Sequence, residues 1–285
     1  MATAQGPTVR RRRLGAELRR LRESAGLTLV EAARHLDTSD STLSRVENGR
    51  GRVRRTDVQA MLDLYGVQEE TLRESLLRIT RDVRRQGWWQ NFRDVISEPY
   101  GDYISLEMDA VSQRIHTIEL IPGLLQTQEY TRALAEAWLV WETPEEINNF
   151  VTVRAERQQV LTRDDPLHLW AVINELALRE MVGGPEVMRA QLEHLLAGGR
   201  QPNITIQIIP FAVGGHAMMD QPFIILGFAE ATDPDVVCLD HLTSTLYIET
   251  IDEVGRYTHM FDHLRSAALS PRESMSKIAD RIKEL

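Results

Sequence analysis

Hydroxyl and guanidinium side chains are concentrated in residues 39–55, which read SDSTLSRVENGRGRVRR and include five arginines. Serine and threonine hydroxyls both donate and accept hydrogen bonds, and arginine donates in a planar fork that matches phosphate oxygens and base edges. Phosphate contacts supply much of the affinity for DNA, whereas base-edge contacts supply specificity. The candidate DNA contacts are Thr28, Ser39, Asp40, Ser41, Thr42, Ser44, Arg45, Asn48, Arg50, Arg52, Arg54 and Arg55.

The charge of the chain changes sign between its two parts. The formal net charge is −9, yet residues 1–85 hold 18 Lys and Arg against 12 Asp and Glu, whereas residues 86–285 hold 15 against 30. A basic front part and an acidic rear part indicate a polyanion-binding module joined to a part with another role. The charge near the binding surface, and not the net charge of the whole chain, determines whether a polyanion is attracted.

Two short helical patterns must position these side chains. Residues 28–36 begin with Thr28 and Glu31 spaced as a capping box, and residues 39–48 begin with Ser39 as the cap. Two helices joined by a three- or four-residue turn, the second short and polar outside, are typical of a helix-turn-helix. The second helix of that motif enters the major groove of DNA. With the helical patterns on either side, the front part is predicted as an all-α domain of five helices.

The second helix of this pair has a predicted inner and outer side. We expect Thr42, Leu43 and Val46 to be buried, and Thr56 to cap the helix that follows. Asp40 has three readings, because a carboxylate there can repel phosphate, accept from cytosine N4, or cap its own helix. We favour the cap, which leaves base readout to Ser41, Ser44 and Arg45.

The rear part mixes strand and helix patterns. Runs rich in β-branched residues, bounded by Pro, Gly and Asp, predict about five strands with flanking helices, in a mixed α/β (α+β) domain. One helix is expected to begin at Pro122, and another at the capping box formed by Thr143 and Glu146. The predicted organisation is a basic N-terminal arm at 1–13, a helix-turn-helix domain at 14–85, an aromatic junction at 86–94 and a regulatory or dimerisation domain at 95–285.

Motifs for catalysis and metal binding are absent from the sequence. It contains no phosphate loop, no G-x-S-x-G and no CxxC. His259 and His263 could share a helix face, but no third metal ligand is evident, and surface histidines explain them better. His216 lies in a Gly-rich loop that could line or cover a ligand pocket, but an ordinary hairpin connection explains the loop better. Cys238 is expected to be an inert core thiol. We therefore expect no enzyme, no metal and no cofactor.

Compartment signals are also absent. No apolar run approaches the roughly 20 residues of a membrane span, and no apolar segment follows the basic residues near the start. A single cysteine suits a reducing compartment. We therefore expect a cytoplasmic protein with no membrane partner.

Longer segments resemble known families. The stretch LGAELRRLRESAGLTLVEAARHLDTSDSTLSRVENGR resembles the XRE (Cro/CI repressor-like) helix-turn-helix family, over residues 12–67. In that resemblance Glu47 matches the usual acidic residue, expected to anchor structure, while Asp40 stands where many relatives have Gln. Residues 95–270, with IPGLLQTQEYTRAL, IQIIPFAVGGH, LYIET and ALSPRESMSKI, resemble the uncharacterised domain that follows this module in actinobacterial, including WhiJ-like, regulators. The resemblance implies developmental or antibiotic-production control, often beside a small companion protein.

These observations predict a sequence-specific DNA-binding transcriptional regulator. The rear domain is expected to provide dimerisation, a partner surface or a small-molecule effector site. A homodimer predicts a palindromic operator whose half-sites lie about 34 Å apart. The alternative is a protein-interaction adaptor whose DNA binding is incidental, and an enzyme fused to a DNA module is a weaker third hypothesis.

Overall fold

The chain divides into two compact units. The computed structural model describes residues 9–285 except 52, 83–87, 93, 230–233 and 242–243. The units are Met1–Trp88 and Trp89–Leu285, so their boundary falls inside the predicted aromatic junction. Residues 1–8 of the predicted basic arm, and Arg52 among the candidate contacts, lie outside the described residues.

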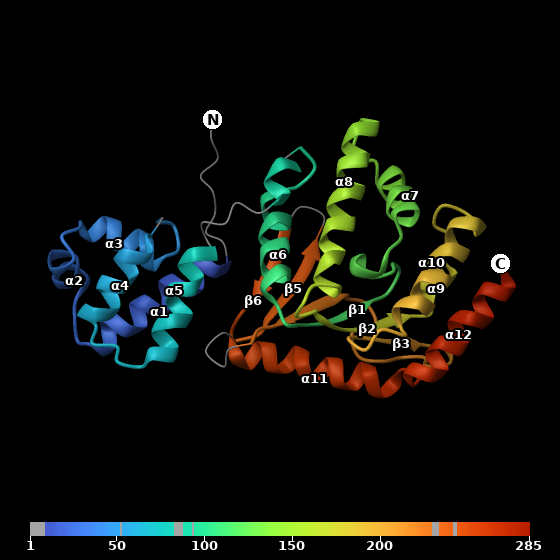
Figure 1. The fold of residues 1–285 in the computed structure, drawn as a ribbon. Helices are drawn as coiled ribbons and strands as arrows, with labels where there is room; N and C mark the ends of the chain where they lie inside the picture. Colours follow the sequence, from blue (N-terminus) through green and yellow to red (C-terminus); the bar gives the residue numbers. More distant parts are fainter. Residues whose placement is uncertain (1–8, 52, 83–87, 93, 230–233, 242–243) are drawn as a thin grey trace. The chain divides into compact units, whose positions relative to one another are not determined.

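The described part of the N-terminal unit contains five α-helices, as predicted (Figure 1). Their inward faces carry leucines at helical spacing, and Leu18, Leu43 and Leu62 are fully buried in one shared core. Each helix carries its apolar residues on one side, and it can bury that side only by packing against the other helices. The helices are α1 (Val9–Ser24), α2 (Leu29–His35), α3 (Asp40–Glu47), α4 (Arg55–Leu64) and α5 (Glu70–Asp82).

Three local details of this unit differ from expectation. The first helix begins at Val9, so residues 9–13 of the predicted arm are helical. Thr42 is exposed, not buried, because it lies on the outer side of α3. The cap of α4 is Arg54, whose backbone N–H donates to the Asp57 carboxylate at 2.9 Å, so Thr56 lies in the first turn and is not the cap.

The C-terminal unit is built on one six-stranded mixed sheet. The strand order is β3-β2-β1-β4-β5-β6; β1, β2 and β3 are parallel, and the other neighbours are antiparallel. Helical crossovers connect the parallel strands, as parallel pairing requires. The strands are β1 (Ser112–Thr117), β2 (His168–Asn174), β3 (Ile204–Ile209), β4 (Phe223–Gly227), β5 (Val236–His241) and β6 (Ser244–Ile248).

Helices cover both faces of the sheet (Figure 1). Helix α11 lies along one face, where its Phe261 and Leu264 pack with Phe223 and Val237 of the strands, and α6, α7 and α8 lie on the opposite side. The helices are α6 (Glu98–Asp109), α7 (Gln128–Trp138), α8 (Pro144–Arg157), α9 (Leu176–Arg179), α10 (Pro185–Gly198), α11 (Ile251–Ala267) and α12 (Pro271–Glu284). Short 3-10 turns are η1 (Trp88–Phe92), η2 (Gly123–Leu125), η3 (Gln158–Leu161) and η4 (Phe211–Val213).

The predicted helix starts in this unit had mixed success. The capping box of Thr143 and Glu146 is confirmed at the start of α8. The helix expected from Pro122 is wrong in its first turns, because Pro122 precedes the short η2 and α7 begins only after its cap, Thr127. A threonine side chain that accepts a backbone N–H determined this start better than the proline did.

Candidate nucleic-acid interface

A capping box at the start of α2 holds the side chain of Thr28 in place. Its hydroxyl oxygen accepts the Glu31 N–H at 3.3 Å, and the Glu31 carboxylate accepts the Thr28 N–H at 2.9 Å and its hydroxyl at 2.7 Å. These hydrogen bonds lower the pKa of Glu31. The predicted capping box is confirmed, and the Thr28 hydroxyl is used within α2 while remaining exposed at its start.

The turn from α2 to α3 places the start of α3 in a defined direction. Asp37 adopts a left-handed backbone, with φ of 50°, which lets the chain reverse in the few residues between the helices. Ser39 then caps α3, and its Oγ accepts the Thr42 N–H at 3.1 Å. The Asp40 carboxylate accepts the Ser41 N–H at 2.8 Å, so it serves the first turn, in line with the capping interpretation, although the cap residue itself is Ser39.

The hydroxyls at the start of α3 form a small network. Ser39 Oγ lies 3.0 Å from Ser41 Oγ and 2.8 Å from Thr42 Oγ1. At the other end of α3, the Asn48 amide donates to the Ser44 carbonyl at 2.8 Å. These bonds hold the polar side chains in set orientations on an exposed surface.

Helix α3 has two distinct sides. Leu43, Val46 and Glu47 face the core and are buried. The exposed residues lie at spacings of three and four along the opposite side, and Ser44 is half-buried at its edge. This face brings together Ser41, Thr42, Arg45 and Asn48.

The candidate arginines do not all have the same environment. Arg45, Arg50 and Arg54 are exposed, and within the described chain the Arg45 and Arg50 guanidinium groups make no hydrogen bond or ion pair. Arg55 is half-buried, and its guanidinium lies 3.4 Å from the Leu77 carbonyl on α5. Arg55 is therefore less available for DNA than the sequence suggested.

A buried ion pair supports α3 from behind. The Arg22 guanidinium on α1 donates to both Glu47 oxygens, at 2.7 and 2.9 Å, and to the Leu27 carbonyl at 2.8 Å. The bonds to Glu47 raise the pKa of Arg22. Burial raises the pKa of the neighbouring Tyr65 to about 12, so its hydroxyl stays neutral. Glu47 is a structural anchor, as predicted, but its partner could not be named from the sequence.

Gly15 is a second supporting residue that sequence analysis missed. A Cβ atom at this position would lie 2.5 Å from the carbonyl oxygens of both Val46 and Glu47, so α1 and the end of α3 touch backbone to backbone. A glycine inside a strong helical pattern is the signal that could have indicated this approach.

Other candidate sites do not assemble. His259 and His263 lie on one face of α11 with their Nε2 atoms 3.0 Å apart, but the described residues contain no group of three His, Cys, Asp or Glu suited to a metal. Cys238 is buried in β5. None of the helices in the described part of the chain has the length and apolar character needed to cross a membrane.

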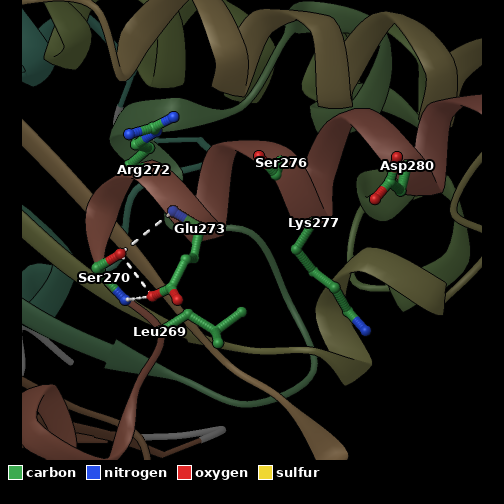
Figure 2. Close-up of a pocket in the computed structure, with 7 residues that line it drawn as sticks. All are labelled: Leu269, Ser270, Arg272, Glu273, Ser276, Lys277 and Asp280. Carbon is green, nitrogen blue, oxygen red and sulfur yellow. Dashed lines mark hydrogen bonds between the residues drawn. The ribbon is translucent and has the colours of Figure 1, made fainter.

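Residues that line a pocket beside α12 make contacts that stabilise the fold (Figure 2). Glu273 accepts the Ser270 N–H at 3.0 Å and its hydroxyl at 2.6 Å, closing the start of the helix. Lys277 lies 3.0 Å from Glu175. These contacts stabilise α12 and give no reason to assign a ligand there.

Comparison with known families agrees with this geometry. Residues 13–76 match the model of a helix-turn-helix domain, so the exposed face of α3 belongs to a DNA-binding module. Residues 100–280 match a domain of unknown function, DUF5753. Because that match spans more than half of the chain, the protein belongs to the DUF5753 family. No curated protein and no solved structure matches the chain. The resemblance to a helix-turn-helix regulator followed by a domain of unknown function is confirmed.

Proposed function

We propose that the protein is a sequence-specific transcriptional regulator. The observation that carries the proposal is the exposed face of α3, where Ser41, Thr42 and Arg45 lie together in front of the buried Arg22–Glu47 pair. A rigid helix with short hydroxyl side chains and one long cation suits close approach to base edges in the major groove.

The arginines after α3 have a separate role in this proposal. Arg50 and Arg54 are exposed on the segment between α3 and α4, where they can contact phosphates on either side of the groove. Such contacts position the helix and supply salt-dependent affinity without reading sequence.

We assign dimerisation to the C-terminal unit. The end of α7 and the two residues after it expose three consecutive apolar side chains: Trp138 at 41%, Leu139 at 86% and Val140 at 58%. Exposed apolar patches often mark protein contacts. A symmetric dimer would bind a palindromic operator with half-sites about 34 Å apart. Replacement of Leu139 by Asp is expected to shift sedimentation toward the monomer, and an unchanged profile would place the interface elsewhere.

Selection of bound sequences from a random duplex pool tests the proposal. The full chain is used at low ionic strength, with and without a companion protein. We expect an enriched palindrome that competes at least ten-fold better than unselected duplex. A pool that stays random in both conditions contradicts sequence-specific regulation.

The second candidate is a protein-interaction adaptor with incidental DNA binding. The exposed apolar residues 138–140 favour it. The adaptor would be supported if the chain captured a protein partner in a pull-down while the duplex pool of the selection experiment stayed random.

We propose no catalytic role and a cytoplasmic site of action. Metal analysis of the purified protein checks the expectation that it carries no metal.

A further inference from the structure

Arg154 on α8 carries a charge with no acidic partner. Its Nε atom is buried without a hydrogen bond, and within the described residues no ion pair involves this side chain. Burial lowers the pKa of Arg154, yet an arginine remains protonated near neutral pH. The residue as a whole is half-buried, and a charge partly withdrawn from water is normally paired, so this one calls for an explanation.

Glu107, the carboxylate whose charge acts on Arg154, already has other partners. Both Glu107 oxygens accept from Arg157, at 2.7 Å each, and one of them also accepts the Tyr103 hydroxyl at 2.7 Å. Arg157 therefore neutralises Glu107. Two arginines and one glutamate leave the cluster with one excess positive charge, which an anion would balance.

Aromatic rings surround this charge. The Arg154 guanidinium lies 5.0 Å from the Phe150 ring centre, and Phe150 lies 4.1 Å from the Trp141 ring centre. Trp138 completes the cluster at 6.1 Å from both rings, and it is partly exposed. A cation–π contact offsets part of the cost of the charge but leaves the buried Nε–H donor without an acceptor.

A glycine leaves room for the guanidinium. The Arg154 side chain lies against Gly123, where any other side chain would collide with it. Gly123 belongs to the PGLLQT segment, which Gln158 fastens to α8 by donating to the carbonyls of Gly123 and Gln126, at 3.2 and 2.6 Å. The segment and the helix thus hold Arg154 in a defined position.

We propose that Arg154 anchors a binding site for a small aromatic carboxylic acid. A carboxylate accepts two hydrogen bonds from a guanidinium fork and supplies the missing negative charge. The half-buried ring of Trp141, which lies against Phe150, offers an apolar surface for the body of the ligand. Ligand binding at Arg154 does not depend on DNA binding by α3. A negative result for one of these two proposals therefore does not contradict the other.

Benzoate is the probe, and benzyl alcohol is its uncharged match. In the full chain, we expect benzoate to raise the unfolding midpoint and quench tryptophan fluorescence with saturation, while benzyl alcohol does neither. Arg154→Gln should weaken benzoate binding at least ten-fold. Arg256→Gln, at an exposed arginine on α11, is the matched control and should bind as the unmodified protein does.

Several other results would overturn the proposal. Benzoate that gives no saturable response, or the same response in Arg154→Gln, removes the site. Phosphate and acetate binding as tightly as benzoate would make it a general anion site and contradict the aromatic ligand. Without ligand, Arg154→Met should unfold at the same temperature as the unmodified chain or higher, because an unpaired charge is removed; a midpoint lower by several degrees would make Arg154 structural.

Discussion

Arg22 of α1 and Glu47, the last residue of α3, form a bidentate ion pair, and both side chains are buried. The pair joins residues 25 positions apart in the sequence. It fixes the C-terminal end of α3 against α1, while Ser39 closes the N-terminal end. The helix proposed to read DNA is thus held at both ends.

Removal of one member of this pair should destabilise the N-terminal unit strongly. In Glu47→Gln the Arg22 charge stays buried without its partner, which typically costs about 3–5 kcal/mol. Urea unfolding of the full chain, followed through the transition of the N-terminal unit, measures the loss. The control is Arg19→Ala, which removes an exposed pair with Glu23 and should leave the midpoint nearly unchanged. A Glu47→Gln protein as stable as this control would show that the pair is not structural.

Two glycine replacements should change the stability of the protein in opposite directions. Gly15→Ala places a methyl group against the backbone of α3 and is expected to cost about 1–3 kcal/mol. Gly255→Ala lies in α11 with no atom within 4 Å, so it should stabilise by up to about 1 kcal/mol through helix propensity. Calorimetry of both variants makes the comparison, and a Gly15→Ala protein that gains stability would refute the close approach.

Arg45 is the residue on α3 expected to read a base. Arg45→Ala should weaken binding to the selected operator by about 1–3 kcal/mol and relax the preference at one base position. Footprinting and gel shifts measure both effects, with Arg19→Ala as the control. Unchanged protection and affinity would remove Arg45 from the interface.

Arg50 and Arg54 are expected to contact phosphates. Their joint replacement by Ala should reduce the slope of log affinity against log salt by about 1.8, because each phosphate contact contributes about 0.9. The base preference of the selected site should not change. Titrations at several salt concentrations provide the slope, and an unaltered value would mean that neither side chain touches phosphate.

Acid should weaken the C-terminal unit through His116. Its two ring nitrogens lie 3.1 Å from the carbonyl oxygens of Val172 and Met218, and burial lowers the pKa of His116. His216 is the titratable group that faces it, with ring centres 6.1 Å apart. Because the folded state favours the neutral ring, its contribution is complete above the unfolded pKa of about 6.5 and is lost as pH falls through the folded pKa.

An NMR titration of the His116 ring checks the direction of this shift. The expected result is a pKa below that of a free histidine, together with an unfolding midpoint that falls between neutral pH and about pH 5. His116→Gln should show a shallower fall over the same interval. A ring pKa at or above the free value would contradict the prediction.

Local patterns in the sequence were sufficient to predict most of the elements and two of the capping boxes. The capping boxes at Thr28 and Thr143 involve partners three residues away, so no tertiary information was needed to find them. The five front helices and the mixed rear domain follow likewise from residue periodicity, because each face must meet a core. The sheet has six strands where about five were predicted.

Contacts between distant segments were decided by the tertiary structure alone. Nothing near Arg22 in the sequence indicates that it meets Glu47, and nothing near Arg154 indicates that it lies against Gly123 without an acid. The sequence determined which side chains could bind an anion or a base, since that depends on residue type and on neighbours within one helical turn. Which of them are paired, buried or left facing solvent depends on the packing of whole elements, and that is settled only when the chain has folded.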